Sequence, residues 1–295
     1  MVIDGKKIAA EILARLAKQP KPKKFLAAVL VGDDQSSISF LAQKEKTAKS
    51  LGVDFRLYKF PTTIKNDGLR EEIGKIAAHK TCGGVIVQLP LPEQLNWYYI
   101  LNAIPPEKDV DVLSERSLGA FYVGRSKVVP PAAGAVEEIL KSFGENSASV
   151  TIRRFTPLES QTVAIVGLGL LVGRPVTNWI MRRAQQTFLL RSVSDMGTLK
   201  QADLVISGVG KSGVIKPAML KDGACVIDFG YQNGKGDFDI TDVELGGDAG
   251  GTAAVAAINT GISAKNISYT PMPGGTGPIL VVKLFENFYK LNQNS

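Results

Sequence analysis

The sequence contains a single histidine, His79, and this scarcity excludes most chemistry that depends on an imidazole. Serine triads and cysteine–histidine pairs both need a histidine base. His79 lies in residues 77–81, which are typical of a helix end, so we expect it to face solvent. Histidine-assisted catalysis is therefore set aside.

Cysteine is also scarce, because the 295 residues include only Cys82 and Cys225. Neither belongs to a Cys-x-x-Cys pair, so the sequence predicts no zinc site and no disulfide framework. Both thiols lie among apolar residues, as is typical of cysteines that pack as small hydrophobic side chains. No metal ion is expected.

Long hydrophobic runs are missing too. Apolar stretches such as residues 26–31 and 85–87 fall far short of the roughly 18 residues that a membrane helix needs. The first six residues lack the basic start and apolar run of a signal peptide. We therefore expect a cytoplasmic chain without a membrane partner.

The charge is moderately basic, with 35 Lys and Arg against 28 Asp and Glu and a net charge of +7. Such a surface suits nucleic acid, a phosphorylated cofactor or a polyanionic substrate. The one basic cluster, residues 18–24, contains no aromatic side chain on which bases could stack. We expect no nucleic-acid partner.

Apolar patterning predicts alternating helices and strands in two series, and the length suggests two domains. In the first series, residues 25–31 and 84–89 are typical of buried strands, and Asp4 is placed to cap the first helix. The second series begins with a strand at residues 161–166. Residues 141–157 are small and polar, which predicts a link. The alternation favours an α/β fold with parallel sheets flanked by helices.

A glycine-rich loop follows the strand at residues 161–166. Residues 167–173 read Gly-Leu-Gly-Leu-Leu-Val-Gly, and Pro175 favours a helix start just after them. Glycines there let the backbone approach a pyrophosphate, whose charge the helix N-terminus favours. The spacing is one residue longer than the standard fingerprint, so a tight turn without ligand would also explain it. The strand before and the helix after favour nucleotide binding.

The end of the next strand, at residues 187–190, bears on the choice of cofactor. Arg191 and Ser192 follow it, and the first acidic residue comes only at Asp195. An arginine there can hold the 2′-phosphate of NADP, whereas a carboxylate favours NAD. NADP is therefore favoured, with NAD and an ordinary exposed arginine as the alternatives.

Several longer motifs occur in a fixed order and carry a more specific signal. They are Gly32 with Ser37, Phe40 and Lys44, GVIVQLPLP at 84–92, KDVD at 108–111, VGRP at 172–175, VID at 226–228 and TPMPGGTGP at 270–278. This order resembles the bifunctional methylenetetrahydrofolate dehydrogenase/cyclohydrolase family over nearly the whole chain. The resemblance implies oxidation of 5,10-methylenetetrahydrofolate by NADP and hydrolysis of the methenyl product to 10-formyltetrahydrofolate, in one-carbon metabolism.

The resemblance also implies the domain organisation. Residues 1–128 would form a folate-binding catalytic domain, and residues 129–270 a Rossmann-type NADP-binding domain. Residues 271–295 would form a loop and a C-terminal helix that returns to the first domain. A homodimer is implied as well.

The family's catalytic lysine, glutamine and pterin-binding aspartate match Lys44, Gln88 and Asp111. A lysine that is shielded from water has a lowered pKa and can act as a base near neutral pH. An uncharged glutamine can aim that amine, and a carboxylate can accept hydrogen bonds from pterin N–H groups. Without the resemblance, Lys44 would pass for a solvated lysine, because Lys46 and Lys49 share its expected helix.

The match also predicts the residues around each ligand. Those expected at the folate are Phe40, Val87, Leu89, Pro273, Gly274, Gly275, Thr276 and Gly277. Those expected at the cofactor are Gly167, Leu168, Gly169, Gly173, Arg174, Arg191, Ser192, Gly210 and Tyr231.

The sequence departs from the family pattern close to these positions. Phe40 replaces a tyrosine one helical turn from Lys44, Val112 replaces the glycine after DVD, and Gly169 replaces a serine. Three alternatives stay open: a dehydrogenase with little cyclohydrolase activity, a non-enzymatic folate- or nucleotide-binding paralogue, and a Rossmann enzyme with another substrate. The Gly- and Ala-rich residues 246–261 carry no assignable pattern.

Overall fold

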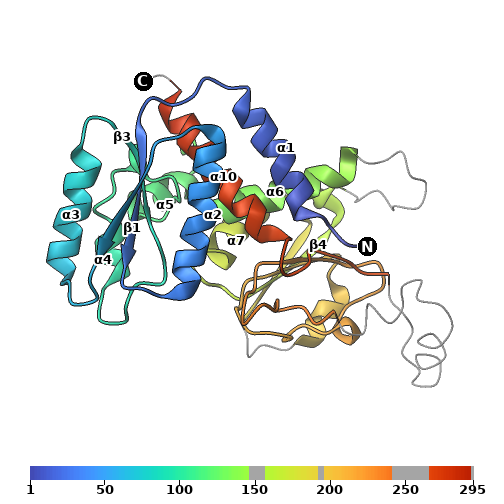
Figure 1. The fold of residues 1–295 in the computed structure, drawn as a ribbon. Coiled ribbons are helices and arrows are strands. Elements are labelled where there is room, and N and C mark those ends of the chain that lie inside the picture. The colour runs from blue at the N-terminus through green and yellow to red at the C-terminus, as the bar shows by residue number, and fades with distance from the viewer. Residues whose placement is uncertain (146–156, 192–195, 241–265, 294–295) are drawn as a thin grey trace. The chain divides into compact units, whose positions relative to one another are not determined.

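The computed structural model of the chain describes residues 1–145, 157–191, 196–240 and 266–293 (Figure 1). The chain divides into two units. The three-stranded unit comprises Ala9–Gly134 and Leu280–Ser295, and the five-stranded unit comprises Met1–Ile8 and Ala135–Ile279. The chain passes from one unit to the other within α1 (Gly5–Ala17), α6 (Pro131–Glu145) and α10 (Thr276–Asn292). Each unit is therefore built from separate parts of the sequence.

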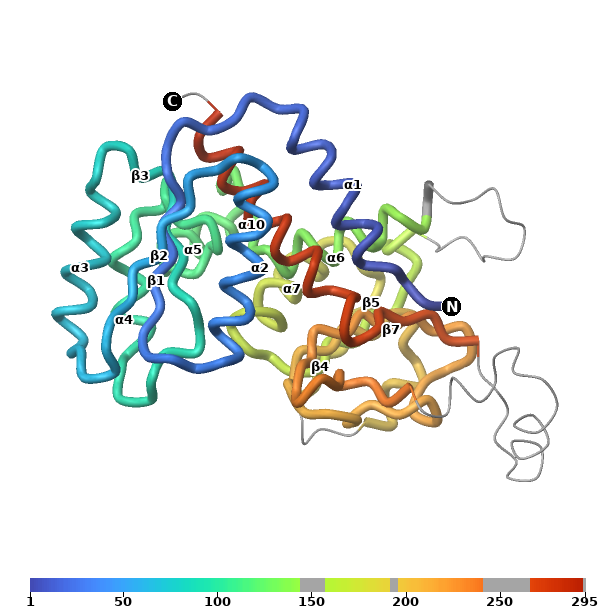
Figure 2. The backbone as a smooth tube through the Cα atoms, viewed as in Figure 1, coloured from blue at the N-terminus to red at the C-terminus, as the bar shows by residue number. Residues whose placement is uncertain are grey.

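The sheet of the three-stranded unit is parallel, in the order β2-β1-β3. Its strands are β1 (Phe25–Val31), β2 (Phe55–Phe60) and β3 (Cys82–Val87). Every residue of β1 and β3 is buried, which explains their continuous apolar sequences. Figure 2 shows α3 (Asn66–Ala78) on one side of this sheet and α2 (Gln35–Leu51) on the other.

Helix α2 has signals at both ends that fix its position. The Asp34 side chain accepts a hydrogen bond from the Ser37 backbone N at 2.7 Å, which caps the N-terminus. Gly52 ends the helix with φ 62°, a left-handed conformation that glycine adopts without a side-chain clash. These signals place Lys44 in the middle of α2, facing the unit's candidate site.

Shorter helices and the part of α10 from Leu280 onward also belong to this unit. The short elements are α4 (Trp97–Leu101), η1 (Pro106–Lys108) and α5 (Glu115–Tyr122). Gly84 on β3 leaves room for α10, because a Cβ there would lie 3.0 Å from Phe288 Cδ2 and 2.7 Å from Val110 Cγ1. The Asn292 amide donates to the Gly83 carbonyl at 2.9 Å. The C-terminal helix thus packs on the unit that holds residues 9–134.

The five-stranded unit contains a second parallel sheet, in the order β5-β4-β6-β7-β8. The strands are β4 (Thr162–Val166), β5 (Gln186–Leu190), β6 (Leu204–Ser207), β7 (Cys225–Asp228) and β8 (Ser268–Tyr269). The short helix η2 (Leu158–Ser160) precedes β4, and helix α7 (Gly173–Ile180) and the short helices η3 (Met196–Gln201) and η4 (Pro217–Met219) lie between later strands. Val2 forms a parallel bridge to Tyr269, so the chain's first residues extend this sheet.

The α/β prediction and most predicted elements are confirmed, and two local predictions are wrong. Residues 141–145 were expected in a link but end α6, whose buried Val136, Ile139 and Phe143 follow helical spacing. Thr276 and Gly277, expected in a loop, begin α10. Residues 246–261 lie outside the described residues.

The histidine and the two cysteines have the exposure that their neighbours in the sequence predicted. His79 is exposed at the end of α3, and Cys82 and Cys225 are buried, free thiols. No helix in the part of the chain that the structure describes combines the length and apolarity needed to cross a membrane.

Candidate functional site

Lys44 and Gln88 meet beside the carboxyl end of β3. The Lys44 ammonium donates to Gln88 Oε1 at 2.9 Å. Gln88, the residue after β3, is 8% exposed, and its Nε2 donates to its neighbour Leu89's carbonyl at 2.7 Å. Its backbone N donates to the Val29 carbonyl at 2.9 Å, which extends the β1 pairing by one residue. The amide is therefore fixed at both ends, with its oxygen directed at the lysine.

The charge of the third predicted residue, Asp111, interacts with the charge of Lys44. Burial lowers the pKa of Lys44, and the negative charge of Asp111 partly opposes that change. Burial likewise raises the pKa of Asp111 from 3.8 to about 6, against the effect of Lys44 and with a contribution from Asp109. The structure thus brings Lys44, Gln88 and Asp111 together in one unit. Perturbed titration of neighbouring groups is typical of functional sites.

A buried carboxylate holds the turn that carries Asp111. Asp109 is 1% exposed, and its side chain accepts from the backbone N of Leu113 at 3.1 Å and of Ser114 at 2.8 Å. A parallel bridge joins Asp109 to Val85 of β3. The turn is consequently anchored to the strand that leads to Gln88.

Val112 has an unusual backbone conformation next to Asp111. Its φ is +57°, in the left-handed region, and its side chain is completely buried. This conformation is a genuine outlier for a β-branched residue and costs an L-residue roughly 1–2 kcal/mol. This backbone conformation explains why a glycine suits this position in the family that the sequence resembles.

At Val112, a glycine substitution should destabilise the fold less than an alanine substitution, which is the reverse of the usual order. Val112→Gly loses the whole side chain but relieves the left-handed strain, whereas Val112→Ala keeps the strain. We expect the Gly variant to be about 1 kcal/mol more stable than the Ala variant. Urea unfolding midpoints of the two variants measure the difference. An Ala variant equal to or more stable than the Gly variant would show that no strain is stored there.

Removing the charge of Asp111 should stabilise the folded chain at neutral pH. Because the folded pKa of about 6 exceeds the ordinary 3.8, the stability that this group contributes falls as pH rises from about 4 to 6. Asp111→Asn should therefore unfold at a higher temperature than wild type at pH 7.5, with a gain in unfolding free energy of no more than about 3 kcal/mol. Thermal unfolding at pH 4 should show almost no difference. A variant less stable than wild type at pH 7.5 contradicts the argument.

Three residues predicted at the folate lie on the same elements as the lysine and glutamine. Phe40 precedes Lys44 by one turn on α2 and is half-buried. Val87, at the end of β3, is buried, and Leu89, after Gln88, is half-buried. Their placement agrees with the sequence match, while their role stays a prediction.

The glycine segment predicted at the folate belongs to the five-stranded unit. Gly275 packs closely, because a Cβ there would lie 2.5 Å from the Pro271 oxygen, and one on Gly5 would lie 1.7 Å from the Gly275 oxygen. Thr276 is buried, and its hydroxyl donates to the Asp228 carbonyl at 2.8 Å. Pro273 is exposed, while Gly274 and Gly277 are half-buried.

The predicted cofactor loop joins β4 to α7 in a tight turn. Gly167 has φ +85°, and a Cβ on Gly173 would lie 1.9 Å from the Gly167 oxygen. A Cβ on Gly169 would meet nothing within 4 Å. The loop therefore folds back on the helix start and leaves open space at its middle, which fits a bound pyrophosphate. Leu168 accepts from the exposed Arg174 side chain at 3.2 Å.

The other predicted cofactor residues follow neighbouring strands of the same sheet. Arg191 comes directly after β5 and is exposed, Gly210 with φ +74° follows β6, and Tyr231, 48% exposed, follows β7. Carboxyl ends of parallel strands meet at one edge of a sheet, where ligands of such folds bind. Ser192 lies outside the described residues.

Sequence reasoning gave no role to two buried carboxylates at this edge, although Asp228 ends one of the quoted motifs. Asp237 accepts from the Ser207 hydroxyl at 2.6 Å and from the backbone N of Val209 at 2.7 Å. Asp228 accepts from the backbone N of Gly230 at 2.7 Å, and burial raises its pKa to about 6. For Asp228, an acidic residue at the end of the apolar run at residues 224–227 was the available signal, whereas Asp237 follows no such run. These side chains hold the loops after β6 and β7.

Comparisons with known proteins match the chain to one family. The family model described as tetrahydrofolate dehydrogenase/cyclohydrolase, catalytic domain, matches residues 3–111, and that of the NAD(P)-binding domain matches residues 146–295. The bifunctional protein FolD of Macrococcus caseolyticus is 32% identical over 294 residues, covering 97% of this chain and 95% of its own.

Solved structures give the same result. The bifunctional FolD methylenetetrahydrofolate dehydrogenase/cyclohydrolase of Campylobacter jejuni aligns with a TM-score of 0.83 at 26% identity, covering 100% of this chain and 99% of its own. The bifunctional 5,10-methylenetetrahydrofolate dehydrogenase/cyclohydrolase of Thermoplasma acidophilum aligns with a TM-score of 0.81 at 25% identity, over 99% and 98% of the two chains.

Proposed function

The chain belongs to the tetrahydrofolate dehydrogenase/cyclohydrolase family, and we propose that it oxidises 5,10-methylenetetrahydrofolate with NADP and hydrolyses the methenyl product to 10-formyltetrahydrofolate. The observation that carries this proposal is the hydrogen bond between Lys44 and Gln88 in a buried setting next to Asp111. The family membership supplies the substrate, and the described residues supply the chemistry.

Lys44 is the proposed base for hydrolysis. Because burial lowers its pKa, a larger fraction of the amine is neutral near pH 7 than for an exposed lysine. The neutral amine can take a proton from the water that attacks the methenyl carbon. Gln88 keeps the amine in place by accepting a hydrogen bond from it, without adding a charge that would raise the lysine pKa.

Asp111 is the proposed anchor for the pterin ring. An ionised carboxylate accepts hydrogen bonds from the amino and ring N–H groups of the pterin, and such charge-assisted bonds are directional. Its raised pKa reflects the cost of burying this charge, and hydrogen bonds from a donor-rich ring would offset that cost. Asp111 therefore sets the position of the one-carbon unit relative to Lys44.

The five-stranded unit is proposed to bind NADP, which supplies a hydride acceptor when bound. The close packing of Gly173 on Gly167 and the open space at Gly169 support a pyrophosphate at the start of α7. Arg191, exposed after β5, is the proposed partner of the 2′-phosphate. A cytoplasmic location and a homodimer are part of the same proposal, the first consistent with the free thiols of Cys82 and Cys225.

The test is a pair of assays on the purified chain. With methylenetetrahydrofolate, we expect reduced-cofactor absorbance to appear with NADP faster than with NAD. With methenyltetrahydrofolate, we expect decay faster than in buffer alone. Folate binding without turnover in either assay would favour a non-enzymatic binding protein.

The presence of Phe40 favours a second candidate function, that of a dehydrogenase with weak cyclohydrolase activity. Its ring shares a face of α2 with Lys44 and carries no hydroxyl that could relay a proton. Phe40→Tyr should then accelerate methenyltetrahydrofolate decay several-fold while the oxidation rate changes little. An unchanged decay rate would show that the hydroxyl is not limiting.

A further inference from the structure

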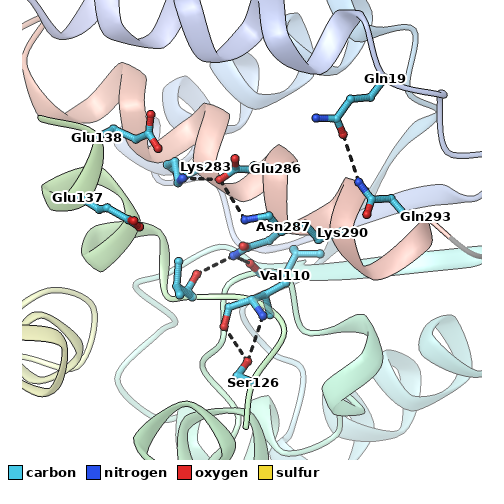
Figure 3. Close-up of polar contacts among 12 residues, drawn as sticks. Gln19, Val110, Ser126, Glu137, Glu138, Lys283, Glu286, Asn287, Lys290 and Gln293 are labelled. Carbon is cyan, nitrogen blue, oxygen red and sulfur yellow. Dashed lines mark hydrogen bonds and ion pairs between the residues drawn. The ribbon is translucent and has the colours of Figure 1, made fainter. Parts of the chain in front are cut away.

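Asn287, on α10, holds two backbone carbonyls of the three-stranded unit. Its side chain is 0% exposed, and its Nδ2 donates to the Val110 oxygen at 2.8 Å and to the Val129 oxygen at 2.7 Å. Figure 3 shows the Asn287 side chain directed at Val110, the residue before Asp111. The last helix therefore contacts the backbone of the candidate site.

The Asn287 side chain interacts with its neighbours through its NH2 donors. Both neighbours are carbonyl oxygens, so only the NH2 end of the side chain can face them. The Asn287 Oδ1 is buried without a hydrogen-bond partner, which costs free energy. What this side chain contributes is therefore the pair of bonds to Val110 and Val129.

Those bonds fix one side of Asp111, and Asp109 fixes the other. The Val110 carbonyl belongs to the peptide group that includes the Asp111 nitrogen, so holding it sets the plane of that peptide. After Asp111, the Asp109 carboxylate holds the backbone N of Ser114 at 2.8 Å. The backbone of Asp111 is thus clamped on both sides.

The carboxylate of Asp111 depends on this clamp. Within the part of the chain that the structure describes, it forms no hydrogen bond, and only the charges of Lys44 and Asp109 act on it. No side chain aims it, so its direction follows from the backbone that carries it. We propose that Asn287 is a positioning residue for folate binding, acting through the Val110–Asp111 peptide. This inference rests on the proposed function.

The test compares two asparagines of the same helix. Asn287→Asp keeps the shape but places oxygens against both carbonyls, which breaks the clamp. The control is Asn292→Asp, because Asn292 is 5% exposed and donates to the Gly83 and Phe288 carbonyls, which do not adjoin Asp111. Each variant is titrated with tetrahydrofolate by calorimetry and assayed with methylenetetrahydrofolate.

We expect Asn287→Asp to weaken tetrahydrofolate binding about tenfold and to raise KM for methylenetetrahydrofolate equally, with kcat within about threefold. Asn292→Asp should leave both within about twofold. In an Asp111→Ala background, adding Asn287→Asp should cause no further weakening, because the effect passes through Asp111. Equal weakening by the two asparagine variants, or additivity with Asp111→Ala, would overturn the proposal.

A milder variant guards against loss of the fold. Asn287→Ser has a single, shorter donor and should weaken tetrahydrofolate binding in the same direction, with a native circular dichroism spectrum. If both Asn287 variants are unfolded, the residue serves stability and the proposal is wrong. A wild-type chain that does not bind tetrahydrofolate rejects the proposed function instead, since the inference concerns only differences among chains that bind it.

Discussion

Lys44→Met should slow methenyltetrahydrofolate hydrolysis by roughly 10²–10⁴-fold, the range typical for loss of a general base. The methionine side chain has a similar length, so the packing of α2 is kept while the amine bonded to Gln88 is lost. Tetrahydrofolate affinity should change by no more than a few-fold, because pterin contacts are assigned to Asp111. Stopped-flow decay of methenyltetrahydrofolate and a calorimetric titration measure the two quantities.

Lys46→Met is the matched control for this result. Lys46 lies two residues further along α2 and is exposed, so the same substitution removes a solvated charge. We expect its hydrolysis rate to stay within about twofold of wild type. If Lys44→Met lowers folate affinity as much as it lowers hydrolysis, the lysine binds substrate and does not transfer a proton.

Gly173→Ala should weaken NADP binding more than tenfold and lower the unfolding temperature by several degrees. Its Cβ would lie 1.9 Å from the Gly167 oxygen and 2.7 Å from the Leu168 Cα, so backbone must move. Overpacking of this kind costs about 1–3 kcal/mol or more, and the loop would leave the conformation that fits a pyrophosphate. Fluorescence titration with NADPH and thermal unfolding measure the effects.

Gly169→Ala, four residues earlier in the same loop, separates packing from binding. A Cβ at Gly169 would meet nothing within 4 Å in the protein, but it would enter the space proposed for the pyrophosphate. The unfolding temperature should therefore stay close to wild type while NADPH affinity falls. An equal loss of unfolding temperature in the two alanine variants would mean that the loop's glycines act through chain flexibility and not through close packing.

The strands and the capped helices were predictable because their signals are local. Residues 25–31 form an uninterrupted apolar run ending at Gly32, and β1 has those bounds. Helix α6 was not predicted, because its first residues, Pro-Ala-Ala-Gly, are small and show no apolar periodicity. The helical spacing is carried only by Val136, Ile139 and Phe143.

The candidate site was predictable only through its motifs. From the residues alone, Lys44 would pass for a solvated lysine, because Gln88, which it contacts, lies 44 residues away in the sequence. The contact of Asn287 with Val110 spans 177 residues, and no local pattern indicates it. Motifs therefore identify the reacting groups, while tertiary contacts determine how they are held.

The alternation of the chain between its two units affects how it can fold during synthesis. Translation delivers Val110, Gly83 and the other partners of α10 long before Asn287 and Asn292. Until residues 280–293 have left the ribosome, those buried carbonyls lack their donors, and the surface that Phe288 covers is open to water. The nascent three-stranded unit should accordingly be sensitive to proteases and dependent on chaperones until its last helix arrives.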